Sequence, residues 1–317
     1  MVQISVIILV KNGGAFLGEV LEGLFSQKGV EAFEVVAVDS GSTDNSREIL
    51  NRYPVRVEEI PPATFNHGET RNLGARLSQG TYLVYLTQDA VPGDDEWLVK
   101  LVEPLREDPL VAGTFSSHRP RKDCPLMERR QILHTVLTSG RDKRVNTAVG
   151  NREFEKNPYP FIWFSNTGSC IRREVWEKLP FRRVEFAEDQ DWAKRVLEAG
   201  YKTVYVPDSI VIHSHHYRPL KNFRRHFEHA KAMREIFGKE EFPRFKAIFS
   251  ATRQSVMADF QFHRSEGGSA WGFYRWFFPS LFWYLSAFSG LWMGTHLEKI
   301  PLRLRERFSL QPSIIKK

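Results

Sequence analysis

Four short segments of strand character, three of them apolar, constrain the fold of this chain more than any other feature of its N-terminal part. They cover Ile4–Val10, Glu34–Val38, Val55–Ile60 and Tyr82–Leu86, and amphipathic, helix-like stretches separate them. Strands that alternate with helices at this spacing predict an α/β fold with a parallel sheet covered on both faces. Ligands of such sheets bind at the carboxyl ends of the strands, which is where Asp39 and Asp89 fall.

Composition narrows the class of protein further. Hydrophobic residues make up 42% and charged residues 26% of the 317 residues, which is ordinary globular usage and argues against disorder, collagen and coiled coil. Cys124 and Cys170 are too few for a disulfide framework or a thiolate zinc site, so we expect a reduced, cytosol-like compartment. The first apolar run stops at Lys11 and has no basic segment before it, which favours a buried strand over a signal peptide.

The charge balance predicts an acidic partner. The formal net charge of +7 is compatible with nucleic acid, an anionic membrane face or a phosphate-bearing substrate. No nucleic-acid-binding motif is recognisable, and the aromatic residues cluster in an apolar run rather than among basic residues, so we do not expect a nucleic-acid partner.

The C-terminal part differs in character from the rest. Residues 218–317 are basic and aromatic, with long helical patterns and no strand signal, and we place a domain boundary near Tyr217. The uncharged segment from Trp276 to Thr295 is interrupted by Pro279. It either lies on a membrane surface, packs against the rest of the chain or a second subunit, or spans the membrane.

Three charged residues are candidates for a site at the strand ends. Asp39 either accepts hydrogen bonds from a nucleoside or only holds its own Ser/Gly-rich turn. Arg71, about one turn into a predicted helix, either reaches a phosphate or base or is a solvated helix arginine. Asp89 follows the fourth strand and is able to bind a divalent cation that bridges a diphosphate.

A second acidic cluster lies at Glu188-Asp189, at the start of a predicted helix. Asp189 is either the helix cap or a general base that takes a proton from an attacking hydroxyl. Glu188 is expected to orient its surroundings rather than to react. Trp192, one turn further on, either walls a sugar-binding cleft or belongs to the core.

Histidines end the last predicted strand. Alternation along this strand puts His213 and His215 on one face and His216 on the other, which makes the first two either metal ligands or hydrogen-bonded structural residues. Cys170 is interpreted as a buried strand residue. The glycine spacing of a dinucleotide-binding fingerprint is absent, which lowers the case for a nicotinamide enzyme.

In order and spacing, these motifs resemble glycosyltransferase family 2, which has the GT-A fold, and within it a bacterial rhamnosyltransferase branch. The resemblance covers about residues 4–217. It rests on SVIILVKNGG, VDSGSTDNS, FNHGETRN, LTQDAVP, SNTGSCIRREVWEKLPF, AEDQDWAKRVLEAGY and VIHSHH.

The resemblance implies roles for particular residues. It makes Asp189 the catalytic base, Glu188 and Trp192 acceptor-binding, and Asp89 and His213 metal ligands, with His215 as the alternative. It places the nucleotide-sugar donor on Val10, Asn12, Asp39, Arg71, Gln88 and Asp89. The sequence departs from the family pattern at Leu9, where many members have proline, and at Thr87, which stands in place of the first aspartate of the metal-binding DxD element.

The function implied is an inverting, hexosyltransferase-type transfer of a rhamnose-like sugar from a nucleotide sugar to a glycan or lipid-linked acceptor, in surface polysaccharide synthesis. The catalytic domain would cover residues 1–217, with a nucleotide-binding half to about residue 115 and an acceptor half from 116. The resemblance further implies a Mg²⁺ or Mn²⁺ ion and a cytoplasmic location, peripheral on the inner membrane face, and it allows a homo-oligomer. The alternative in another class is an inactive membrane scaffold of the same fold.

Overall fold

The computed structural model describes residues 3–30, 32–240, 242 and 244–308. The chain divides into two compact units. The first contains Met1–Arg121, Ile132–Val184 and Glu188–Ser214, and the second contains Lys122–Gln131, Glu185–Ala187 and His215–Lys317. The domain limits expected from the sequence, near residue 115 and at Tyr217, remain predictions.

The first unit is built on one large sheet with the strand order β3-β2-β1-β4-β8-β6-β9-β5, to which β7 is added through β9. The strands β1 to β4 are mutually parallel, as expected, whereas β8 runs antiparallel to both β4 and β6. The strands are β1 (Ile4–Val10), β2 (Phe33–Asp39), β3 (Val55–Glu59), β4 (Tyr82–Thr87), β5 (Val91–Pro92), β6 (Val111–Arg119), β7 (Arg144–Thr147), β8 (Gly168–Arg172) and β9 (Lys202–Ile212).

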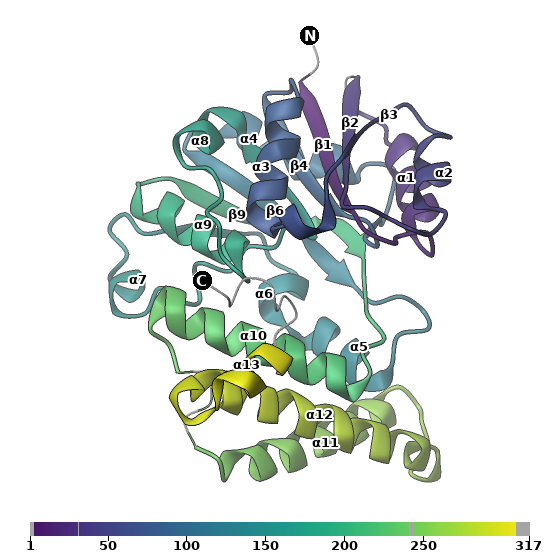
Figure 1. The fold of residues 1–317 in the computed structure, drawn as a ribbon, viewed down its shortest axis with the longest axis vertical. Coiled ribbons are helices and arrows are strands. Elements are labelled where there is room, and N and C mark those ends of the chain that lie inside the picture. The colour runs from purple at the N-terminus through teal and green to yellow at the C-terminus, as the bar shows by residue number, and fades with distance from the viewer. Residues whose placement is uncertain (1–2, 31, 241, 243, 309–317) are drawn as a thin grey trace. The chain divides into compact units, whose positions relative to one another are not determined.

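Helices cover both faces of this sheet because its central strands are apolar on both sides (Figure 1). Val6 and Ile8 of β1 lie in the core shared with α1 (Leu17–Phe25), α2 (Ser46–Leu50) and α4 (Trp97–Glu107). Ile7, which points the other way, lies in the core shared with α3 (His67–Leu77), α8 (Arg173–Lys178) and α9 (Glu188–Glu198). The short helices α6 (Val136–Ser139) and α7 (Arg152–Lys156) complete the unit.

The sequence analysis did not identify one central strand. Residues 111–119 form β6 inside the sheet, although the region that begins near residue 115 is polar in sequence. Two of its buried hydroxyls are paired with α4: the Thr114 hydroxyl donates to the Leu101 carbonyl oxygen, and Ser116 accepts from the Trp97 indole at 2.9 Å. Paired hydroxyls allow a strand with a polar pattern to be buried.

The second unit is helical, with α10 (Pro219–Phe237), α11 (Ala247–Ser265), α12 (Tyr274–Thr295), α13 (Leu302–Phe308) and the first residues of α5 (Leu126–His134). Two glycines of α12 let it lie directly on α10. A Cβ atom at Gly290 or Gly294 would stand 2.3 Å from the carbonyl oxygen of Phe223 or Phe227, respectively. Glycine at this four-residue spacing therefore sets the distance between the two helices.

The α12 helix also corrects an expectation from the sequence. Pro279 does not interrupt the segment, because α12 continues through it as one helix from Tyr274 to Thr295. Proline at this sixth position removes one backbone hydrogen bond, the one to the Arg275 carbonyl oxygen, and the helix continues past it. None of the helices in the described part of the chain is long and apolar enough to cross a membrane.

Candidate active site

The turn after β2 holds Asp39 through both of its carboxylate oxygens. Oδ1 accepts from the Ser42 backbone N–H at 2.9 Å and from its hydroxyl at 2.7 Å, and Oδ2 accepts from Nε of Arg47 at 2.8 Å. Burial opposes ionisation of Asp39, but hydrogen bonds from Arg47 and Ser42 hold its pKa below the usual value. Asp39 thus fixes the turn as an ionised group, and its contact with a nucleoside remains a prediction.

Val10, Asn12 and Gln88 lie at the same edge of the sheet as Asp39. Val10 is paired with Asp39 in the β1–β2 register, and Leu9 with Thr87 in the β1–β4 register. Asn12 accepts the Thr43 N–H through Oδ1 at 2.8 Å, and Gln88 accepts the Lys11 N–H at 2.8 Å. These two bonds tie the loop after β1 to the turn after β2 and to the loop after β4. The predicted donor-site residues Val10, Asn12 and Gln88 therefore lie at one edge of the sheet.

Lys11 belongs to this edge, although we did not single it out in the sequence. Its ammonium group donates to the carbonyl oxygen of Ser40 at 3.0 Å and to that of Gly41. This brings a positive charge to the carboxyl ends of β1 and β2. A lysine directly after an apolar strand was the available signal, and it was read only as the end of that strand.

Arg71 and Glu188 form a buried ion pair. Their side chains are only 9% and 8% exposed. Burial alone would raise the pKa of Glu188, but Arg71 and His67 lower it below its ordinary value. The structure therefore gives Arg71 a partner that sequence reasoning did not assign, while its predicted contact with the donor stays a prediction. The orienting and acceptor-binding roles expected of Glu188 likewise remain predictions.

Asp189 follows Glu188 at the start of α9 and is held by two backbone N–H groups. Asn166 donates to Oδ2 at 3.2 Å and Gln190 donates to Oδ1 at 2.9 Å. Burial and the neighbouring Glu188 carboxylate raise the pKa of Asp189 to about 7. Two adjacent carboxyl groups therefore differ in protonation near neutral pH, an arrangement suited to acid–base chemistry.

The environment of Asp189 connects it to the strand ends. The Thr87 N–H at the end of β4 donates to the Thr167 carbonyl oxygen at 3.2 Å, one residue from the Asn166 N–H that binds Asp189. Asn166 is nearly inaccessible and was not predicted as a site residue. Its backbone N–H binds Asp189, and its side chain accepts from the Ser169 hydroxyl at 2.8 Å and helps to lower the pKa of Glu188.

Trp192 corrects the sequence interpretation. Its side chain is 0% exposed, its indole N–H donates to the Leu179 carbonyl oxygen at 2.9 Å, and its ring packs against Phe164 and Phe181. A fully buried ring cannot wall a cleft, so the acceptor-binding role predicted for Trp192 is wrong and the alternative core role holds.

Asp89 and His213 lie together beyond the ends of β4 and β9. Oδ1 of Asp89 is 3.5 Å from Nε2 of His213, and the ligand atoms of Asp89, His213 and His215 all lie within 4.8 Å of one another. One carboxylate oxygen and two imidazole nitrogens form a ligand set for a divalent metal ion. The hydroxyl of Thr87, two residues before Asp89, is buried and has no hydrogen-bond partner among the described residues.

Arg121 supports the Asp89 loop. Its guanidinium donates to the Asp89 carbonyl oxygen at 3.2 Å and pairs with Glu19 at 2.8 Å, and it stacks over the Phe16 ring. No sequence pattern distinguished Arg121 from the many other arginines of the chain.

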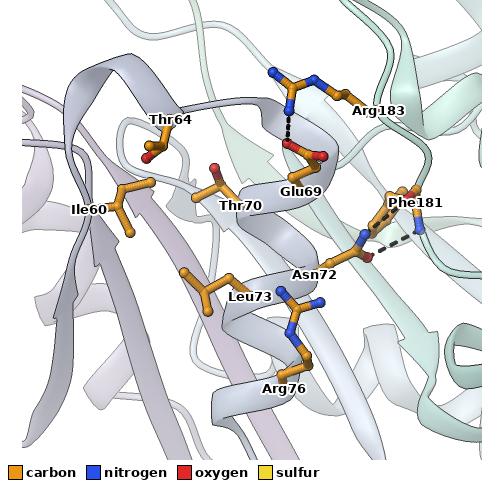
Figure 2. Close-up of a pocket in the computed structure, with 9 residues that line it drawn as sticks. All are labelled: Ile60, Thr64, Glu69, Thr70, Asn72, Leu73, Arg76, Phe181 and Arg183. Atoms are coloured by element: carbon orange, nitrogen blue, oxygen red, sulfur yellow. Dashed lines mark hydrogen bonds and ion pairs between the residues drawn. The ribbon is translucent and has the colours of Figure 1, made fainter.

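A cavity of about 460 Å³ lies on the outer side of α3. Figure 2 shows Glu69 and Arg183 paired at one end and Arg76 at the other, with Ile60, Leu73 and Phe181 among the apolar lining. None of the site residues predicted from the sequence lines it.

Comparisons with known proteins agree with this architecture. A family model described as Glycosyl transferase family 2 matches residues 5–168. The O-antigen chain rhamnosyltransferase RfbN of Salmonella typhimurium is 27% identical, with 98% of this chain and 95% of that protein covered. The O-antigen chain rhamnosyltransferase WbaN of Salmonella anatum is also 27% identical, over 91% of this chain and 88% of that protein.

Solved structures share the fold at low sequence identity. Mannosyltransferase PcManGT from Pyrobaculum calidifontis, in complex with GDP-Man and Mn²⁺, superposes with a TM-score of 0.59 at 18% identity and covers 92% of this chain and 87% of its own. TarS 1-349 of S. aureus in complex with UDP gives a TM-score of 0.53 at 13% identity, with 94% and 92% covered. The expected GT-A-type α/β fold with a helical C-terminal region is confirmed.

Proposed function

We propose, because the chain belongs to glycosyl transferase family 2, that it moves a rhamnose-like hexosyl group from a nucleotide sugar to a glycan or lipid-linked acceptor. The O-antigen chain rhamnosyltransferases support this choice, since they match over almost their whole length as well as that of this chain. Surface polysaccharide synthesis is the corresponding process. The family match and the structural likenesses both support transfer of a sugar from a nucleotide sugar.

The observation that carries the proposal is the split between the two carboxyl groups at the start of α9. Arg71 keeps Glu188 ionised, and this negative charge together with burial raises the pKa of Asp189 to about 7. A base whose pKa lies near neutrality combines a useful deprotonated fraction with a strong tendency to take up a proton. The backbone N–H groups of Asn166 and Gln190 fix the direction of the carboxylate.

In the proposed reaction Asp189 removes the proton of an acceptor hydroxyl. The hydroxyl oxygen attacks the anomeric carbon of the donor sugar as the bond from that carbon to the diphosphate oxygen breaks. The electron pair of this bond leaves with the nucleoside diphosphate, and the configuration at the anomeric carbon inverts. Lys11 supplies positive charge at the strand ends where a diphosphate would sit.

Asp89 and His213, with His215 as the third group, would hold a divalent cation such as Mn²⁺ or Mg²⁺. When bound, such an ion neutralises charge that develops on a departing diphosphate. The mixed oxygen and nitrogen ligands fit this group, although Thr87 replaces a carboxylate of the family pattern. The bond from Arg121 to the Asp89 carbonyl oxygen keeps the Asp89 loop in place.

A lipid-linked acceptor would locate the protein at the inner face of the cytoplasmic membrane. Diphosphate-lipid acceptors carry negative charge, which is compatible with the basic composition of the chain. This peripheral location is part of the proposal.

The proposal is tested by incubating the protein with a panel of nucleotide sugars, with and without Mn²⁺, and measuring release of the nucleoside diphosphate. We expect release from a deoxyhexose donor above the other donors, with stimulation by Mn²⁺. An inactive scaffold of the same fold would release no nucleotide from any donor under either condition, and that result would overturn the enzymatic assignment.

A further inference from the structure

The exposed side of α11 carries large apolar side chains interleaved with arginines. Phe249, Arg253, Met257, Phe260 and Arg264 follow one another at spacings of three or four residues, so they form one stripe along the helix. Phe249 is 60% and Met257 50% exposed. An amphipathic helix of a globular protein would carry polar residues at these positions.

A second stripe begins just before α12. Trp271, Tyr274, Phe278 and Phe282 are all more than half exposed, Trp271 by 81%, and Arg275 lies among them. The two stripes approach each other at the turn that enters α12, where the Phe260 ring is 5.3 Å from the ring of the buried Phe273. Isolated apolar residues on a surface are ordinary, but two connected aromatic stripes indicate a docking surface.

Within these two helices the exposed charge has one sign, and Glu266, which directly follows α11, is paired with Arg129. Asp259 is the single carboxylate of α11, and it is fully buried in an ion pair with Arg130; α12 has none. The exposed charges of the two helices are therefore those of Arg253, Arg264 and Arg275. Two copies of such a surface would repel each other, whereas an anionic partner would be attracted.

We propose that these two stripes, the aromatic–arginine face, dock the protein on an anionic lipid bilayer surface. Trp, Tyr and Phe rings enter the boundary between headgroups and acyl chains, while arginines extend toward the phosphates with their methylene groups in the apolar layer. Each arginine near such a surface adds attraction that depends on lipid charge.

The structure also selects which part of the uncharged C-terminal segment is available. The second half of α12 packs on α10 through Gly290 and Gly294, so only its first half, together with α11, presents aromatic side chains outward. This inference rests on the peripheral location proposed above, but not on the sugar-transfer chemistry, because none of its residues belongs to the candidate site.

The test is co-sedimentation of the full chain with phosphatidylcholine vesicles that contain or lack phosphatidylglycerol. Four proteins are compared: the wild type, W271S/F278S, R253Q/R275Q, and the control L110S/R152Q, which changes exposed residues of the first unit. Far-UV circular dichroism and release of nucleoside diphosphate from the donor are measured on each. These readings separate loss of folding or of the enzymatic function from loss of docking.

We expect the wild type and L110S/R152Q to bind phosphatidylglycerol vesicles equally. R253Q/R275Q should bind about thirtyfold more weakly at low salt, and W271S/F278S at least about tenfold more weakly. Wild-type binding that does not depend on phosphatidylglycerol would overturn the proposal. So would undiminished binding by W271S/F278S, or self-association of the wild type that this variant abolishes.

Discussion

At the scale of single residues, the candidate site depends on how its charges are paired. Glu188 and Asp189 are adjacent in the chain, yet they are expected to ionise at different pH. Arg71 pairs directly with Glu188 and lowers its pKa, whereas for Asp189 burial and the Glu188 charge outweigh the effect of Arg71. Sequence reasoning identified both carboxylates but not this division of roles. The partner of Glu188 is Arg71, more than a hundred positions away, and no pattern in the sequence connects them.

The raised pKa of Asp189 predicts a specific pH dependence of transfer. The base must be deprotonated, so the rate should rise as pH increases through about 7. Glu188→Gln removes the negative neighbour, lowers the pKa of Asp189 and moves the rising limb of the profile to lower pH.

The measurement is kcat against pH for the wild type, Glu188→Gln and the exposed control Glu153→Gln. The control should follow the wild type. An unchanged rising limb in Glu188→Gln would show that Glu188 does not tune the base.

The proposed metal ligands predict a change in thermal stability. Mn²⁺ that binds the folded state but not the unfolded state raises the protein's free energy of unfolding. The rise is about 2.7 kcal/mol when the Mn²⁺ concentration is one hundred times the dissociation constant. We expect this rise in Tm to disappear in His213→Ala and to persist in His216→Ala, which lies three residues further along the chain. Equal Mn²⁺ shifts in both variants would remove His213 from the metal site.

At the scale of elements, the sequence pattern predicted β1, β2, β3 and β4 to within one or two residues, because each is a short segment of strand character bounded by turn residues. It did not identify β6, where buried Thr114 and Ser116 give a polar pattern whose hydroxyls are paired with Leu101 and Trp97 of α4 and with Ser209 of β9. In β9, Pro207, Asp208 and Ser209 interrupt the apolar pattern of one continuous strand. Tertiary hydrogen bonds, which a local pattern does not contain, account for the β6 error.

The contact between α10 and α12 predicts opposite effects for two glycine substitutions. Gly290→Ala would place Cβ 2.3 Å from the Phe223 carbonyl oxygen and should lower the free energy of unfolding by about 1–3 kcal/mol. Gly18→Ala in α1 meets no atom within 4 Å and should raise it by up to about 1 kcal/mol, since alanine favours the helix.

Urea denaturation followed by circular dichroism measures both changes. If Gly290→Ala proved as stable as the wild type, the close approach of the two helix backbones would be wrong.

At the scale of the whole molecule, the sequence was sufficient for the fold class, and the fold places several of the predicted site residues together. Because the carboxyl ends of parallel strands lie at the same edge of a sheet, Asp39, Gln88 and Asp89 could be expected to lie at one edge. The path from that edge to Asp189 was not predictable, because it runs through backbone groups of Asn166 and Thr167 that any residue could supply. For Trp192 the sequence left two roles open, and only its burial in the core between α9 and the sheet decided between them.

The central claim is that Asp189 is the base of a sugar transfer, and single-turnover transfer by Asp189→Asn tests it most directly. We expect the rate to fall by about 10²–10⁴ while the nucleotide sugar still binds, with full activity in Asp142→Asn, which changes an exposed aspartate elsewhere in the first unit. Transfer by Asp189→Asn at the wild-type rate would contradict the claim.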